Sequence, residues 1–132
     1  MHILYLHQHF ALPTGSTGTR SYEMARRWIR AGHQVTLICG RSDQSGLPDV
    51  VGRIGRLNVE GIDLRIVRIA YGNKQGFASR VLAFLSFMFW SFWVGQGIKR
   101  IDVIFATSTP LTIGIPAMLL RWFKRRPYIF EI

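Results

Sequence analysis

The sequence contains 132 residues, which is enough for one domain with a substantial core but not for the two lobes that many transferases and dehydrogenases use. Its formal net charge is +10 and its basic residues occur in short clusters, which favours contact with phosphate groups or with an anionic membrane surface. Cys39 is the only cysteine, which excludes an internal disulfide and a zinc site built from cysteines.

The first part of the sequence has the pattern of a strand, a helix and a second strand. Ile3 to Leu6 and Gln34 to Cys39 are short apolar runs, typical of strands that are buried on both faces. Arg20 to Arg30 between them has the spacing of an amphipathic helix, and Gly32 is placed to end it. This spacing predicts parallel strands joined by a helical crossover. The N-terminus lacks the basic and apolar regions of a secretory signal, so we expect a cytoplasmic protein.

The remaining elements continue the alternation of strands and helices. Residues 62 to 69 alternate loosely and predict a third strand, after a loop that is rich in Gly, Pro and Ser from Gly40 to about Gly55. Asp102 to Ala106 and Tyr128 to Ile132 predict two more strands, which flank a helix from about Gly114 to Phe123. The order predicts an α/β fold in which helices cover parallel strands. Because the sequence ends in a strand with no helix behind it, we expect an incomplete domain.

A long apolar segment, Val81 to Ile98, contains no charged residue and is rich in Phe and Trp. Three interpretations remain open. The segment is a membrane-spanning helix of marginal length, a crossover helix buried against the sheet, or a helix in the plane of the membrane with one side on the sheet. The third explains both the aromatic residues and the basic charge, and it predicts membrane contact by Phe89, Trp90, Phe92 and Trp93.

The turn between the first strand and the first helix is a candidate phosphate site. It consists of Gly15, Ser16, Thr17, Gly18 and Thr19, with Arg20 at the start of the helix. Glycines allow close backbone approach, and the first N–H groups of a helix attract an anion, to which an arginine adds a charge-assisted hydrogen bond. The alternative is a flexible turn in which Thr19 only caps the helix. Neither a dinucleotide-binding fingerprint nor a P-loop is present.

Polar residues follow two of the predicted strands. His7 and His9 lie where the first strand ends, on the same side of the chain, and hydrogen bonding to a polar substrate or to the loop is expected of them. No third ligand is near, so no metal site is predicted. Thr107, Ser108 and Thr109 follow a later strand and should lie at the same sheet edge as the turn from Gly15 to Thr19. Their hydroxyls either hold a sugar or phosphate or cap the next helix. Glu131 is the only carboxylate at a late strand end, and no catalytic triad is recognisable.

Two stretches closely resemble the N-terminal domain of glycosyltransferase family 4, especially its bacterial branch that builds capsule, O-antigen and colanic-acid sugars. They are HILYLHQHFALPTGSTGTRSYEMARRWIRAGHQVTLICG and DVIFATSTPLTIGIPAMLLRWFKRRPYIFEI. The resemblance implies that residues 1 to 132 form part of a Rossmann-like domain, a parallel sheet with helices on both faces, that is the N-terminal half of a GT-B fold. Such enzymes transfer a sugar from a nucleotide-sugar donor with retention of configuration and without a metal or other cofactor.

The resemblance also implies roles for individual residues. The loop from Gly15 to Thr19 faces the donor diphosphate, and the first lobe shapes the acceptor side. The acceptor is a lipid-linked saccharide, so the expected partners are a nucleotide sugar, this acceptor and an anionic surface at the inner face of the plasma membrane. Relatives continue into a second lobe that holds most nucleotide contacts, and we expect this chain alone to be inactive.

Two other functions fit parts of the pattern. A non-catalytic binding module at the membrane periphery accounts equally well for the basic clusters and the aromatic helix. Nucleic-acid binding rests on charge alone, because no helix-turn-helix, RRM or zinc signature is present, and it is not expected.

Overall fold

The structure is a computed structural model of the chain, and it describes residues 1–7, 10, 20–40, 54–67, 77–98, 100–107 and 114–131. For residues 77–80, 83, 84, 114 and 131 it describes the backbone only. In chain order the elements are β1 (His2–Leu6), α1 (Arg20–Arg30), β2 (Gln34–Gly40), β3 (Ile54–Val59), β4 (Ile62–Val67), α2 (Phe77–Gly97), β5 (Val103–Thr107), α3 (Gly114–Lys124) and β6 (Tyr128–Glu131).

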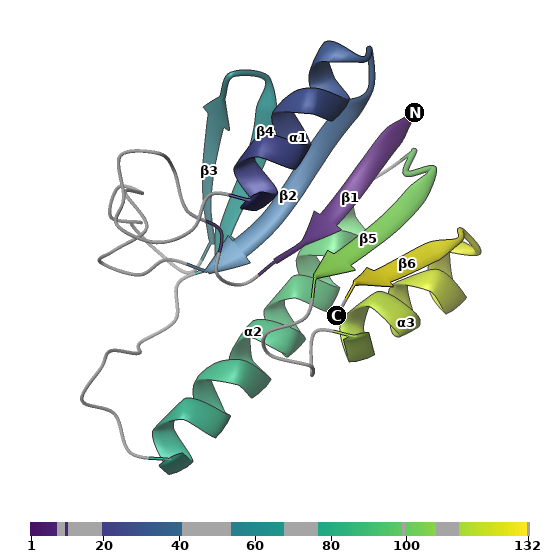
Figure 1. Cartoon of the computed structure of the whole chain (residues 1–132). Coiled ribbons are helices and arrows are strands. Elements are labelled where there is room, and N and C mark those ends of the chain that lie inside the picture. Colours follow the sequence, from purple (N-terminus) through teal and green to yellow (C-terminus); the bar gives the residue numbers. More distant parts are fainter. Residues whose placement is uncertain are drawn as a thin grey trace.

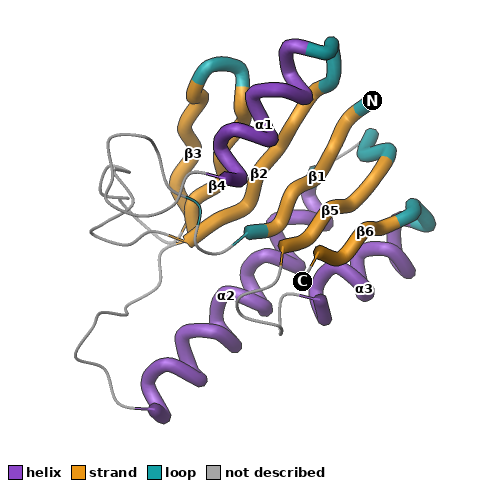
Figure 2. Tube along the Cα trace, viewed as in Figure 1, coloured by secondary structure: helices purple, strands orange, loops and turns teal. Residues whose placement is uncertain are grey.

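These elements form three layers, with one sheet between two layers of helices (Figures 1 and 2). The strand order is β3-β4-β2-β1-β5-β6, and every pairing is parallel except that of β3 with β4. Helix α1 covers one face of the sheet, and α2 and α3 cover the other. The predicted α/β fold, a Rossmann-like and mostly parallel sheet with helices on both faces, is therefore confirmed.

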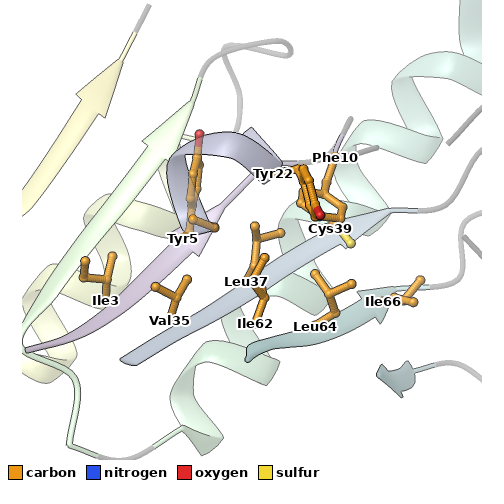
Figure 3. Close-up of a cluster of buried hydrophobic side chains, with 11 residues drawn as sticks. Ile3, Tyr5, Phe10, Tyr22, Val35, Leu37, Cys39, Ile62, Leu64 and Ile66 are labelled. Carbon is orange, nitrogen blue, oxygen red and sulfur yellow. The ribbon is translucent and has the colours of Figure 1, made fainter. Parts of the chain in front are cut away.

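The core on the α1 side is built from alternating residues of three central strands (Figure 3). Side chains of β1, β2 and β4 lie under α1, and Phe10 and Tyr22 close the cluster next to Cys39. Central parallel strands are buried on both faces, which explains their nearly continuous apolar sequences. Burial raises the pKa of the Cys39 thiol, so this cysteine is an inert core residue.

The core on the opposite side joins α2 and α3 to the sheet. Gly95 allows this close packing, because a Cβ at its position would lie 2.8 Å from a methyl carbon of Leu120. Lys124 donates a hydrogen bond to the carbonyl oxygen of Ile98 at 2.6 Å, just after the end of α2, and burial lowers the pKa of its amine. A cation at this end also complements the helix dipole of α2.

Gly32 ends α1 as predicted. Its φ is +96°, its N–H donates to the carbonyl of Ile29, and the N–H of His33 donates to the carbonyl of Trp28. This pair of hydrogen bonds is a Schellman motif, which favours glycine at the left-handed position.

The segment before β4 contains a strand, β3, that was not predicted from the sequence. Gly40 is the last residue of β2, and β3 begins at Ile54 and pairs antiparallel with β4. Glu60 and Gly61 connect these two strands in a two-residue turn with φ of 51° and 92°. Positive φ at both positions is the geometry of a type I′ hairpin. The predicted strand at 62 to 69 is confirmed as far as Val67, and residues 68 and 69 lie outside the described part of the chain.

Candidate functional site

The carboxyl ends of the parallel strands meet at one edge of the sheet, where α1 also begins (Figure 1). This edge is where open α/β sheets bind their ligands. Within the described residues, the end of β1, the end of β5 and the first turn of α1 bring polar side chains to it.

His7 is held at this edge by contacts to two elements. Its backbone N–H donates to the carbonyl of Ile38 at 3.1 Å, which extends the pairing of β1 with β2. Its Nδ1 lies 2.8 Å from the hydroxyl of Ser21, a buried residue in the first turn of α1. The hydrogen bond to Ser21 fixes the ring orientation, so the imidazole occupies a defined position between strand and helix.

A second polar pair joins the two central strands next to His7. The hydroxyl of Tyr5 lies 2.7 Å from that of Thr107, and both residues are buried. The rings of Tyr5 and His7 are stacked, with centroids 6.1 Å apart. Thr107 pairs with Glu131 of β6, so the backbone of the one late carboxylate also lies at this edge. Imidazole and hydroxyl groups are hydrogen-bonding partners for sugar hydroxyls.

Aromatic rings support this polar edge from the α1 side of the sheet. Tyr5, Trp28 and Phe105 contact one another with centroid distances of 5.4, 5.1 and 5.3 Å. Tilted and edge-on contacts of this kind restrict ring motion. The polar groups of Tyr5 and its neighbour His7 are thus carried on a packed support.

The start of α1 adds positive charge at the same edge. Arg20 is its first residue and is exposed, and the buried Ser21 follows. The first N–H groups of a helix lack helical partners, and together with the helix dipole they favour a bound anion. The exposed Glu23 in the same turn opposes this effect to some extent.

A profile of the glycosyl transferase 4-like domain family matches residues 15–132. The chain belongs to this family. No curated protein matches it in a sequence comparison. The match extends over β2 to β6, all three helices and the residues just before α1, which include the candidate phosphate turn. The expected membership in glycosyltransferase family 4 is confirmed at this level.

In this glycosyltransferase 4-like domain, the predicted site residues are only partly described. His7 and Arg20 lie at the same edge of the sheet. The turn of Gly15, Ser16, Thr17, Gly18 and Thr19 lies outside the described residues, as do His9, Ser108 and Thr109.

Sequence reasoning placed Thr107 at this edge of the sheet but did not assign Tyr5 or Ser21 to the site. One signal was available for Tyr5, because residues two apart on a strand point to the same face, and His7 was already a candidate. Ser21 gave no signal, since a serine in a first helical turn has many local uses.

The four aromatic residues predicted to contact a membrane divide into two pairs. Phe89 and Trp93 are 53% and 56% exposed. Trp90 and Phe92 are partly buried and pack against the core under α2. The described helices include no candidate for a membrane-spanning segment.

Among the described residues of the domain, no three His, Cys, Asp or Glu side chains come together as metal ligands.

Proposed function

We propose that this glycosyltransferase 4-like domain is the N-terminal lobe of a retaining glycosyltransferase. The enzyme moves a sugar from a nucleotide-sugar donor to a lipid-linked saccharide acceptor during the synthesis of bacterial surface polysaccharide. The family match over residues 15–132 carries the proposal of sugar transfer. The polar cluster at the carboxyl edge of the sheet supports the location of the site.

The donor diphosphate is proposed to bind at the start of α1. The N–H groups of the first helical turn and the guanidinium of Arg20 provide positive charge there. The preceding turn from Gly15 to Thr19 contributes small residues that allow close backbone approach. These groups stabilise the negative charge that develops on the leaving diphosphate during transfer.

The acceptor saccharide is proposed to bind beside His7. Its imidazole, held by Ser21, offers a hydrogen bond of fixed direction to a sugar hydroxyl. The pair of hydroxyls on Tyr5 and Thr107 holds the ends of β1 and β5 together and keeps His7 in place through the stacked ring of Tyr5. Orienting the acceptor in this way lowers the entropic part of the barrier.

A sugar-transfer assay tests the proposal. The chain, joined to a C-terminal glycosyltransferase lobe, is incubated with membrane lipid extract and radiolabelled nucleotide sugars. We expect label in the lipid fraction, and a decrease of at least about tenfold in kcat/KM for His7→Ala, because a hydrogen bond to the acceptor is lost.

The matched control is His33→Ala, because His33 precedes β2 at the opposite edge of the sheet. It should transfer sugar at the rate of the unmodified protein. Equal activity of the two variants, or no labelled lipid with any nucleotide sugar, would contradict the proposed function.

A further inference from the structure

Helices α2 and α3 present large apolar side chains to the outside. Eleven large hydrophobic residues of the described chain are exposed, and nine of them belong to these two helices, so they are gathered and not scattered. They are Val81, Leu82, Leu85, Phe89, Trp93, Ile115, Met118, Trp122 and Phe123, and we call them the outer apolar face. A gathered apolar surface of this kind marks an interaction site.

The exposed residues follow helical spacing on each helix. On α2 the exposed Leu85, Phe89 and Trp93 recur every four residues, whereas Phe87 and Ser91 on the opposite side are buried. On α3 the exposed Met118 and Trp122 form a similar stripe, and Ala117 and Leu120 are buried against the sheet.

Both helices therefore have an inner apolar side that packs on the sheet and an outer apolar side that does not. An ordinary surface helix would be polar on its outer side.

The two stripes form one surface because the helices pack tightly together. The rings of Phe92 and Phe123 are in edge contact at 5.6 Å. Gly95 faces Leu120 across the helix interface, and Lys124 is hydrogen-bonded to the carbonyl of Ile98. The outer apolar face is thus carried by a fixed pair of helices.

Positive charge lies at one end of this face, and neither helix contains an acidic residue. Arg121 is exposed in the last turn of α3, and Arg125 and Arg126 are exposed just after its end. Arg100 is exposed shortly after α2. Among the described residues, none of these four arginines forms an ion pair. The charge of this surface is therefore complementary to an anionic partner.

We propose that the outer apolar face docks on the surface of an anionic phospholipid membrane. Tryptophan and phenylalanine partition to the boundary between head groups and acyl chains, and arginines at the rim contact anionic head groups. The combination of aromatic residues, basic residues and no acidic residue favours lipid over a soluble protein partner, whose surface carries both signs of charge.

The orientation of α2 places the candidate site close to this membrane. The 21 residues of α2 extend about 31 Å, whereas the seven residues of strand β2 extend about 23 Å. Figure 1 shows α2 projecting past the carboxyl ends of the strands. Val81 and Leu82, in the first two turns of α2, are exposed. This step rests on the proposed function, because a lipid-linked acceptor would reach the carboxyl edge from the membrane beside it.

Vesicle sedimentation with the full chain tests the docking surface. We expect the chain to pellet with vesicles of equal parts phosphatidylglycerol and phosphatidylcholine, and far less with phosphatidylcholine alone. Each basic residue near an anionic surface contributes about fivefold to binding, so Arg125→Gln with Arg126→Gln should weaken binding about thirtyfold. The matched control is Arg27→Gln with Arg30→Gln, which removes the same charge from exposed positions on α1.

Two outcomes of the charge comparison would overturn the proposal. The first is equal weakening by the two double variants, because net charge and not this surface would then govern binding. The second is the absence of sedimentation with anionic vesicles.

A second variant tests the apolar part of the surface. Trp93→Gln with Trp122→Gln changes two exposed side chains and should leave the fold intact while reducing vesicle binding at least about tenfold. If this variant instead converts a stable dimer into a monomer and vesicle binding is unchanged, the face is a self-association interface and the proposal is wrong. The assay contains no sugar donor, so intact vesicle binding with no sugar transfer would contradict the proposed function alone.

Discussion

Tyr22 connects α1 to the β3–β4 hairpin through one acidic residue. Its hydroxyl donates a hydrogen bond to the carboxylate of Glu60, and Arg26 forms an ion pair with the same carboxylate at 3.1 Å. The guanidinium of Arg26 also lies over the ring of Tyr22, 5.5 Å from its centroid. The hydrogen bond to Glu60 and burial together raise the pKa of the Tyr22 hydroxyl.

This raised pKa predicts a pH dependence of stability. Above about pH 10 the unfolded chain releases the Tyr22 proton while the folded chain keeps it. The free energy of unfolding therefore falls as pH rises from about 10 through the pKa of the folded state. Tyr22→Phe removes this contribution, so the difference in stability between the two proteins should shrink with rising pH. Urea unfolding between about pH 8 and about pH 11 measures it, and a constant difference would contradict this assignment.

His7 illustrates which properties of a single residue can be predicted from the sequence. Its position at the end of an apolar strand indicated a place at the ligand-binding edge, because strand direction is a local property. Its partner Ser21 belongs to the next element of the chain, and the contact depends on how α1 is placed on the sheet. The same limit applies to the hydroxyl pair of Tyr5 and Thr107, which are 102 positions apart.

Helix α2 is the element whose sequence permitted several interpretations, because it is apolar on all sides. Periodicity reports which side of a helix is buried only when the other side is polar. The buried side is marked by small residues as well as large ones, since Ser91 and Gly95 are both buried. Gly95 is needed for the close approach of α3, a requirement that no single-sequence pattern reveals.

A substitution at Gly95 tests this packing. A Cβ there would lie 2.8 and 3.0 Å from the two methyl carbons of Leu120 and 3.4 Å from Leu4. We expect Gly95→Ala to lower the free energy of unfolding by about 1–3 kcal/mol, as overpacking does in other cores. Gly97→Ala is the matched control, because a Cβ at this position meets no atom within 4 Å and alanine is the better helix former. Equal stability of the two variants, measured by urea unfolding, would show that α2 and α3 are not in close contact at Gly95.

The fold could be predicted from the sequence in its parallel part, which includes the edge strand β6, but not at the opposite edge, which is formed by β3. Strands β1, β2, β4 and β5 are marked by apolar runs, because central parallel strands need them on both faces. Strand β3 is an edge strand whose residues are only half-buried or exposed, so its sequence carries no such run. Its turn uses Glu60 and Gly61, whereas the dipeptides that most strongly predict a type I′ hairpin begin with Asn, Asp or Gly.

The whole molecule has two surfaces with different chemistry, and each is assigned one of the proposed functions. The carboxyl edge combines imidazole, hydroxyl and guanidinium groups of β1, β5 and α1. The outer apolar face of α2 and α3 combines aromatic and basic groups. The first is proposed to bind the donor and acceptor, and the second is proposed to bind the membrane in which the acceptor resides.

The start of α1 is the proposed site for the diphosphate of a nucleotide sugar, and amide NMR tests this most directly. The isotope-labelled full chain is titrated with nucleoside-diphosphate sugars and with pyrophosphate alone. We predict saturable shifts of the Arg20 and Ser21 amides with both kinds of ligand. Saturable shifts confined to the opposite edge, around Gly32 and His33, or no shifts at any ligand concentration, would contradict the account.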